Sequence, residues 1–130
     1  MDLVAIAKSV IARRSEAVLV PFREVGMKGA AGEPDWLPQP KFCHDNVAAW
    51  VSRSPQHKRV RGYVIFDMRM LIGVWQVQAH TVVKLEDGAL IDITPSGVSR
   101  PYPFVRHIGT EEEFAEMVRA IRVDVSAGSI

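Results

Sequence analysis

The sequence predicts an α+β fold with a small antiparallel sheet, on three observations about the order of its apolar patterns. Two stretches with helical spacing, residues 2–14 and a run that starts at Cys43, precede the strand-like part of the chain. Strand-like stretches then follow one another over residues 61–94, and a further helical pattern begins at Thr110. Helices that are separated in this way from a run of strands are typical of α+β proteins.

The first half of the chain is expected to contain two helices around a long loop. Residues 2–14 carry apolar side chains at helical spacing behind Asp2, which can cap a helix. Residues 17–22, AVLVPF, are either a short strand or an extended arm. Residues 23–42 are rich in glycine and proline and should form a loop. The second helix starts at Cys43, and one side of it carries Cys43, Val47, Trp50 and Val51.

The second half is expected to form strands, a loop and a final helix. The strand-like stretches are RGYVIFDM at 61–68, LIGVWQVQ at 71–78, AHTVVKL at 79–85 and ALIDIT at 89–94. A loop should follow at 95–103, and Thr110 then opens a capping box with Glu113. The apolar face of that last helix is Phe114, Met117, Val118 and Ile121. At 130 residues, the chain should be a single domain, residues 1–130.

Composition and charge exclude several classes of protein. Hydrophobic residues make up 48% of the chain and charged residues 24%, values typical of globular proteins. The formal net charge is only +1, so we expect no nucleic-acid partner and no membrane partner. The single cysteine cannot form an internal disulfide, the N-terminus lacks the pattern of a secretory signal, and no segment is apolar for about 18 residues. A cytoplasmic location is therefore expected.

The register of one hairpin is informative. A two-residue loop in AHTVVKLEDGALIDIT would set charged residues among apolar ones. A three-residue loop, Glu86–Asp87–Gly88 with glycine in the left-handed position, gives one apolar face instead. Its facing pairs are Leu85 with Ala89, Val83 with Ile91 and Thr81 with Ile93. On the opposite face His80 and Asp92 become diagonal neighbours, about 7 to 8 Å apart. They can form a catalytic His-Asp pair or a hydrogen bond that serves stability alone.

Cys43 has three possible roles, because a lone cysteine can be a buried apolar residue, a metal ligand or a nucleophile. Its place at the start of a helix favours the nucleophile, since the partial positive charge there stabilises a thiolate. A histidine nearby would stabilise the thiolate further, and His80 can supply it if the helix packs against the sheet.

At this point the chain resembles papain-like folds, most closely the transglutaminase-like thiol hydrolases. These have a cysteine at a helix start, then a histidine on a strand and an aspartate on the adjacent antiparallel strand. The sequence is also similar to uncharacterised bacterial proteins with a Cys-His-x-Asn motif, through CHDN at 43–46 and AHTVVKLEDGALIDITP, within about residues 38–95. The resemblance implies Cys43 as nucleophile, His80 as general base and acid, and Asp92 as the orienting carboxylate.

The same resemblance implies an oxyanion hole near the helix start and a thioester intermediate, with no cofactor. Backbone amides of Cys43 and His44 could form part of that hole. The group that completes it is open among Gln39, His44 and Asn46, and Asn46 can equally be a polar residue of the first helical turn. The substrate would be a peptide or a small amide or acyl compound, with either hydrolysis or acyl transfer as the outcome.

Two other functions remain open. A binding domain with the same fold could hold a peptide or small acyl ligand without catalysis. A metal site could use Cys43, His44, His80 and Asp92. No Cys-x-x-Cys or His-Glu-x-x-His spacing is present, so no metal is expected.

The remaining aromatic and histidine residues fit structural roles. Trp36, Trp50 and Trp75 either line a cleft or belong to the core, and the core is favoured for large aromatic side chains. His57 and His107 are expected at the surface.

Overall fold

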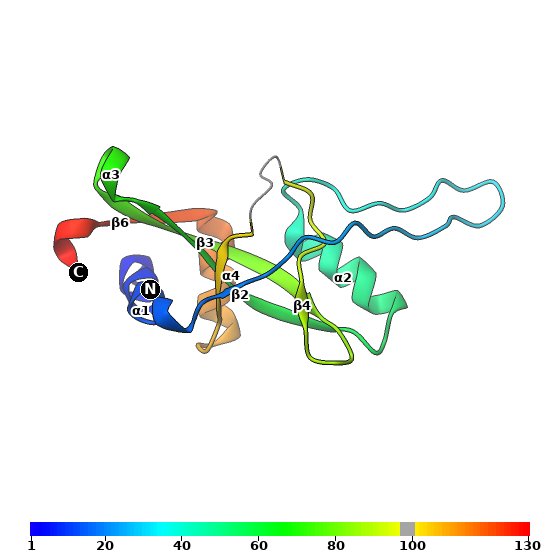
Figure 1. Ribbon diagram of the computed structural model, residues 1–130, viewed down its shortest axis with the longest axis horizontal. Helices are drawn as coiled ribbons and strands as arrows, with labels where there is room; N and C mark the ends of the chain where they lie inside the picture. The colour runs from blue at the N-terminus through cyan, green and yellow to red at the C-terminus, as the bar shows by residue number, and fades with distance from the viewer. Residues whose placement is uncertain (97–100) are drawn as a thin grey trace. The chain divides into compact units, whose positions relative to one another are not determined.

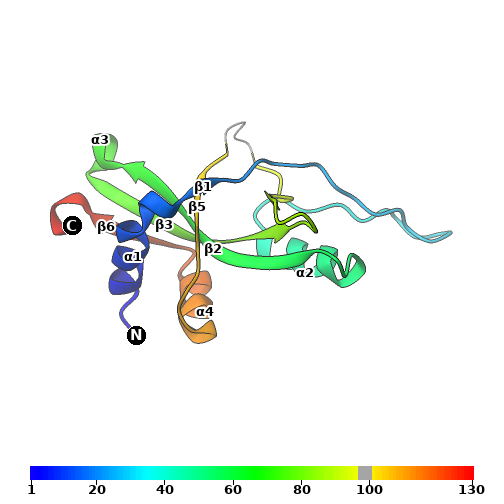
Figure 2. The ribbon, with the colours of Figure 1, turned by 60° about the horizontal axis from the view of Figure 1, so that its bottom comes forward.

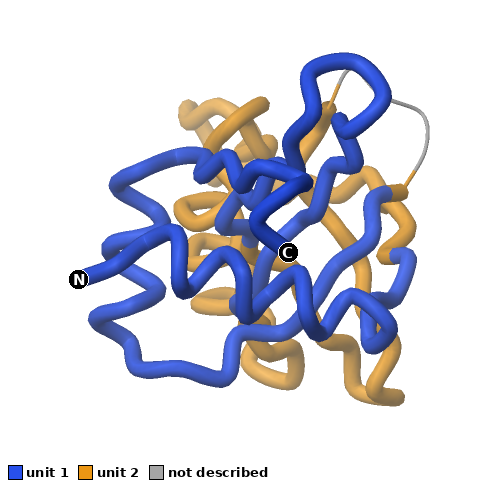
Figure 3. Tube along the Cα trace, turned by 90° about the vertical axis from the view of Figure 1, so that its left-hand side faces the viewer, with its two compact units in different colours: residues 1–19, 61–80, 102–130 blue, residues 20–60, 81–101 orange. Residues whose placement is uncertain are grey.

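A computed structural model describes residues 1–96 and 101–130. The chain is α+β with a small open antiparallel sheet, which confirms the predicted fold class at this level. It divides into two compact units (Figure 3). Unit 1 comprises residues 1–19, 61–80 and 102–130, and unit 2 comprises residues 20–60 and 81–101. The single domain over residues 1–130 stays a prediction.

Unit 1 holds most of the regular structure. Its elements are α1 (Leu3–Ala12), the 3-10 turn η1 (Arg14–Glu16), β1 (Val18–Leu19), β2 (Lys58–Met68), α3 (Arg69–Ile72), β3 (Val74–Lys84), β5 (Pro103–Arg106), α4 (Glu111–Ala120), β6 (Arg122–Ser126) and the 3-10 turn η2 (Ala127–Ser129). The strands β2 and β3 each continue into unit 2, which also contains α2 (Cys43–Arg53) and β4 (Leu90–Ile91). The strand order is β1-β5-β2-β3-β4, and β6 also pairs with β3.

The core of unit 1 lies between its strands and two helices. Figures 1 and 2 show α1 and α4 on the same side of these strands. Side chains from both helices and from β2, β3, β5 and β6 form one buried cluster. Its members are Ala7, Val10, Ile11, Tyr63, Ile65, Trp75, Val77, Ala79, Val105, Phe114, Met117, Val123 and Val125. Trp75 therefore belongs to the core, the favoured role.

Both predicted helix caps in unit 1 are confirmed. The Asp2 carboxylate accepts from the Ala5 amide at 3.0 Å and caps α1. Thr110 and Glu113 form the reciprocal capping box of α4. The prediction for Ile121 is wrong: α4 ends at Ala120, and Ile121 follows it with φ 67° and a side chain that is 70% exposed.

The predicted hairpin register is confirmed in unit 2. Val83 faces Ile91, Lys84 faces Leu90, and the Leu85 amide donates to the Ala89 carbonyl at 2.8 Å. Gly88 has φ 90°, so glycine occupies the position that other residues rarely adopt. The apolar face of this hairpin packs against α2 and the tryptophans of the long loop and helix. That buried cluster is Val47, Val83, Ile91 and Ile93, with Val25, Trp36, Trp50, Val51 and Leu85 against it.

The strand predicted over residues 89–94 is longer than the strand that forms. β4 ends at Ile91, and Asp92 forms a parallel bridge with Phe22. The Asp92 amide donates to the Pro21 carbonyl at 2.9 Å, and the Asp92 carbonyl accepts from the Arg23 amide at 2.9 Å. Residues 17–22 thus combine both expected forms, a two-residue strand followed by an extended segment.

Three other predictions of secondary structure need correction. The stretches 71–78 and 79–85 are mostly one strand, β3, and α3 with Gly73 at φ 72° makes the preceding turn. The short strands β5 and β6 were not predicted. In the expected loop 95–103, residues 97–100 lie outside the described residues, and β5 starts at Pro103. Among the described helices, none has the length and apolar character needed to cross a membrane.

Candidate functional site

Cys43 is the first residue of α2, as the sequence predicts. The residue before it, Phe42, occupies the cap position and makes no side-chain hydrogen bond to the helix. Lys41 has φ 69°, so the chain turns sharply just ahead of the helix. The cysteine is not in a disulfide and is only 8% exposed. Its thiol therefore lies at the positive end of an 11-residue helix, in a largely buried position.

Asn46 fixes the segment that leads into α2. Its Oδ1 accepts from the Gln39 amide at 2.9 Å, and its Nδ2 donates to the Gln39 carbonyl at 2.8 Å. The same Nδ2 donates to the Thr94 hydroxyl at 3.1 Å. Asn46 is 4% exposed and Thr94 is 8% exposed. We call this arrangement of Gln39, Asn46 and Thr94 the Asn46 clamp.

The Asn46 clamp changes the interpretation of two candidate oxyanion residues. Asn46 uses its side-chain amide to hold residue 39 and Thr94, which supports a structural role for it in the first turns of the helix. The Gln39 side chain is directed elsewhere, because its Nε2 donates to the Leu37 carbonyl at 3.2 Å. The oxyanion role of either side chain stays a prediction.

His44 connects the start of α2 to strand β3. Its Nδ1 and the Thr81 hydroxyl are 2.6 Å apart, and Thr81 is 1% exposed. A threonine hydroxyl can donate or accept, so the bond is compatible with either state of Nδ1. Together with the Asn46 clamp, this contact anchors the first turn of α2 through side chains at two of its positions.

His80 and Asp92 have well-defined surroundings of their own. His80 is a half-buried residue of β3, and its ring lies edge-on to Phe104 of β5, with centroids 6.5 Å apart. Asp92 is half-buried beyond the end of β4, and its Oδ1 accepts from the Thr94 amide at 3.0 Å. This Asx-type bond, with the two backbone bonds to the segment around Phe22, fixes the orientation of the carboxylate.

The structure therefore brings together a set of polar contacts around the first turn of α2, all within unit 2. These contacts join Gln39, Asn46 and Thr94 in one group and His44 and Thr81 in another. The sequence did not predict that Thr81 and Thr94 form these hydrogen bonds. A threonine in a strand-like stretch gives the same sequence pattern whether its side chain only packs or also forms a hydrogen bond. The grouping of Cys43, His80 and Asp92 into a triad stays a prediction.

Trp36, Trp50 and His57 form an aromatic cluster in unit 2. The rings of Trp36 and Trp50 stack with centroids 6.4 Å apart. The Trp50 Nε1–H donates to His57 Nδ1 at 3.0 Å. His57 is half-buried, so it is partly exposed, and its ring accepts a hydrogen bond from the helix it follows. Both tryptophans pack on the core of unit 2, the favoured role.

His107 is likewise half-buried, and both nitrogens of its ring have a hydrogen-bond partner. Its Nε2 lies 2.7 Å from the Thr110 carbonyl and must donate to it, so in the neutral ring Nδ1 accepts from the Tyr63 hydroxyl at 2.8 Å. Burial, and next the negative charge of Glu113, raise the pKa of Tyr63 to about 12, while Arg13 opposes the shift. The tyrosine hydroxyl therefore stays protonated at ordinary pH values and can donate to the neutral ring of His107.

The described residues contain no group of three or more histidine, cysteine or acidic side chains arranged to hold a metal ion. Comparison with family models, with curated proteins and with solved structures finds no match for this chain.

Proposed function

We propose that the protein is a thiol hydrolase or acyltransferase that acts on an amide or related acyl bond. Cys43 is the nucleophile, His80 the general base and acid, and Asp92 the carboxylate that orients His80. The observation that carries the proposal is the position of Cys43 at the first residue of α2, where a helix of 11 residues begins without a side-chain cap. The first-turn amides there can stabilise a thiolate or an oxyanion.

The hairpin register supports the choice of His80 and Asp92. The register is observed at Val83 with Ile91 and at Lys84 with Leu90. Continued by one pair beyond the ladder, it sets Val82 opposite Asp92, so that His80 is the diagonal neighbour of the aspartate. A carboxylate that accepts a hydrogen bond from one imidazole nitrogen leaves the other nitrogen to take up a proton.

The proposed reaction is acyl transfer through a thioester. His80 takes the proton of the Cys43 thiol, and the thiolate sulfur forms a bond to the carbonyl carbon of the substrate. The tetrahedral intermediate collapses when His80 returns the proton to the leaving amine and the carbon–nitrogen bond breaks. Water or a second amine then attacks the thioester, loses a proton to His80 and releases Cys43 as a thiol. Peptides and small amides or acyl compounds are the substrate classes, and no cofactor takes part.

The test is the rate of alkylation by iodoacetamide as a function of pH, read by mass spectrometry of the intact protein. An ordinary thiol is less than about 1% thiolate at pH 6, so rapid alkylation there requires a stabilised thiolate. We expect wild-type Cys43 to react at least tenfold faster than free cysteine at pH 6. In His80→Gln and Asp92→Asn the pH of half-maximal rate should move upward, because the imidazolium is lost or less stabilised.

His57→Gln is the matched control, because it replaces a half-buried histidine of unit 2 that has no proposed role. Its alkylation profile should coincide with that of the wild type. If His80→Gln and Asp92→Asn also leave the profile unchanged, the proposed triad is wrong. If Cys43 in addition reacts no faster than free cysteine, the alternative of a non-catalytic binding domain is favoured.

A further inference from the structure

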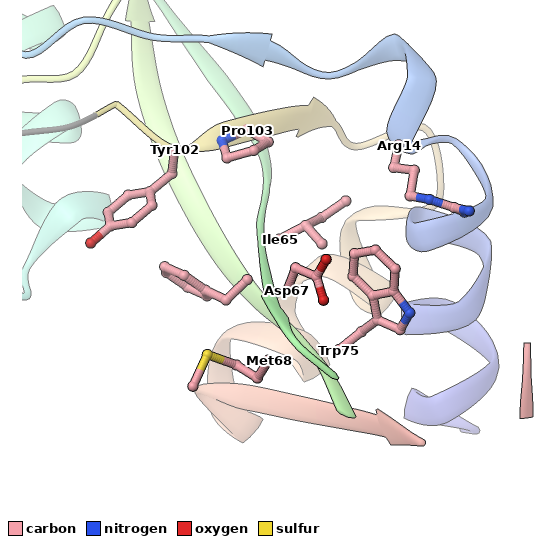
Figure 4. Close-up of a pocket in the computed structure, with 8 residues that line it drawn as sticks. Arg14, Ile65, Asp67, Met68, Trp75, Tyr102 and Pro103 are labelled. Carbon is pink, nitrogen blue, oxygen red and sulfur yellow. The ribbon is translucent and has the colours of Figure 1, made fainter. Parts of the chain in front are cut away.

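A cavity of about 450 Å³ lies in unit 1, where strand β5 begins beside β2. Its volume falls in the range of about 300–1,000 Å³ that is common for small-molecule sites. In Figure 4 Tyr102 and Arg14 lie on opposite sides of the view, with Ile65 and Asp67 between them. The lining consists of Arg14, Ile65, Phe66, Asp67, Met68, Trp75, Tyr102 and Pro103.

Aromatic and apolar side chains form most of the wall. The Phe66 and Tyr102 rings meet edge to face, with centroids 4.7 Å apart, and so fix each other. Trp75 is 7% exposed and is held in the core of unit 1. Met68 supplies a flexible apolar contact that can adapt to a ligand. The wall is therefore suited to the apolar part of a small molecule.

The charges at the cavity do not cancel. Asp67 is engaged by Arg69 through two bonds, Nε to Oδ1 at 2.9 Å and Nη2 to Oδ2 at 2.8 Å. The guanidinium carbons of Arg69 and Arg14 lie over the Trp75 ring, 4.2 and 5.3 Å from its centroid. Of these two arginines, only Arg69 pairs with a carboxylate in the part of the chain that is described. Two positive charges thus lie near one negative charge.

Arg14 is the second arginine at the cavity, and it forms no ion pair with a carboxylate among the described residues. Its Nη1 donates to the Ile11 carbonyl at 2.9 Å, which orients the guanidinium but does not neutralise it. A guanidinium has five N–H donors, arranged to bind a carboxylate through two of them. A ligand that has an apolar body and one negative group would satisfy both the wall and this arginine.

We propose that this cavity binds a small amphipathic carboxylate, whose apolar body lies against Trp75, Phe66 and Tyr102 and whose carboxylate pairs with Arg14. The inference does not depend on the proposed hydrolase activity, because Cys43, His80 and Asp92 are not among the residues that line the cavity.

The test compares three probes of equal chain length by calorimetry: octanoate, neutral octanamide and cationic octyltrimethylammonium. On the wild-type protein octanoate should bind at least threefold more tightly than octanamide, and the cation should bind most weakly. Arg14→Gln should weaken octanoate binding about three- to tenfold, the range expected for a partly exposed charged hydrogen bond. It should leave octanamide binding unchanged, since only the charge of the ligand is affected.

Nuclear magnetic resonance locates the site. Octanoate should shift the indole N–H signal of Trp75 and leave those of Trp36 and Trp50 unchanged, because these two lie in unit 2. Arg119→Gln, which changes an exposed arginine of α4, is the control for charge and should bind octanoate like the wild type. Cys43→Ser should also bind it normally, which separates this site from the proposed active site.

Several results would overturn the proposal. If octanoate does not bind, or binds no more tightly than octanamide, the carboxylate of the ligand is not recognised and the proposal is wrong. Tighter binding of octyltrimethylammonium would instead indicate a cation site of aromatic rings and Asp67. Equal losses of octanoate and octanamide in Arg14→Gln would show that the arginine only shapes the cavity.

Discussion

Replacement of Asn46 by alanine tests whether the Asn46 clamp stabilises the fold. The substitution removes three hydrogen bonds, two to the backbone of Gln39 and one to Thr94. A buried hydrogen bond contributes about 0.5–1.5 kcal/mol, and the unsatisfied partner groups add to the loss. Residue 39 is exposed, so water can replace part of the hydrogen bonding that its backbone loses. The expected loss therefore lies in the lower half of the range that results when the three contributions are added. We expect Asn46→Ala to lower the free energy of unfolding by about 2–3 kcal/mol.

Asn46→Asp tests the hydrogen bonds of Asn46 separately from the size and shape of its side chain. The aspartate is nearly the same size, but its carboxylate cannot donate to the Gln39 carbonyl or to Thr94. It would face that carbonyl in a buried position, which raises the pKa of the introduced acid above its unfolded value. An acid whose pKa is raised by folding contributes stability below its unfolded pKa and loses it as pH rises through the folded value. The free energy of unfolding of Asn46→Asp should therefore lie far below that of the wild type at pH 7 and closer to it near pH 4.

The measurement is urea denaturation followed by tryptophan fluorescence, to which Trp36 and Trp50 contribute from the same unit. Ser52→Ala is the matched control in α2, because its hydroxyl donates to the Ala49 carbonyl within the same helix and the residue is exposed. It should change stability by less than about 0.5 kcal/mol. A loss below about 0.5 kcal/mol in Asn46→Ala would refute the stabilising role of the clamp.

Three other predictions test further parts of the structure. Tyr63 should titrate near pH 12 in absorbance at 295 nm, and Tyr63→Phe should remove that component of the titration. Because folding raises the pKa of Tyr63, the stability that this residue contributes should be intact below pH 10 and lost as the pH rises toward 12. Thr110→Ala should lower stability by about 1 kcal/mol through loss of the α4 cap, while Thr110→Ser should stay close to the wild type in the same thermal unfolding experiment. Gly88→Ala should lower the free energy of unfolding by about 1–2 kcal/mol, because the loop holds residue 88 at φ 90°. No atom lies within 4 Å of an added Cβ, so the loss comes from the backbone conformation and not from a clash. A substitution without effect on stability would contradict the three-residue loop.

The parts of the fold that sequence predicted are those with local causes. The caps at Asp2 and Thr110 each act within four residues, so the helix starts can be read directly from the chain. The hairpin register follows from a short loop and the alternation of apolar residues around it. Of the two-residue and the three-residue loop, only the three-residue loop sets Val83 opposite Ile91 on one buried face, and this is the register observed.

The parts that were missed depend on distant partners. β5 pairs with β1 and β2, and β6 with β3, across long stretches of sequence. Such short strands carry little pattern of their own, because tertiary packing decides their conformation. The hydrogen bond between Tyr63 and His107 was missed for the same reason: the two residues are 44 positions apart, and nothing near position 107 indicates the bond.

The surroundings of Cys43 are more ordered than a buried apolar residue requires. A cysteine that only fills space needs contacts such as those of Val47, which is fully buried one turn further along α2. Here two further side chains of the same helix start, His44 and Asn46, are used to bond Thr81, Thr94 and the backbone of residue 39. Bonds of this kind fix the angle and the rotation of a helix end more narrowly than apolar packing does, because they are directional. A helix start held in this way suits a nucleophile, whose sulfur must stay in line with a carbonyl carbon through several steps.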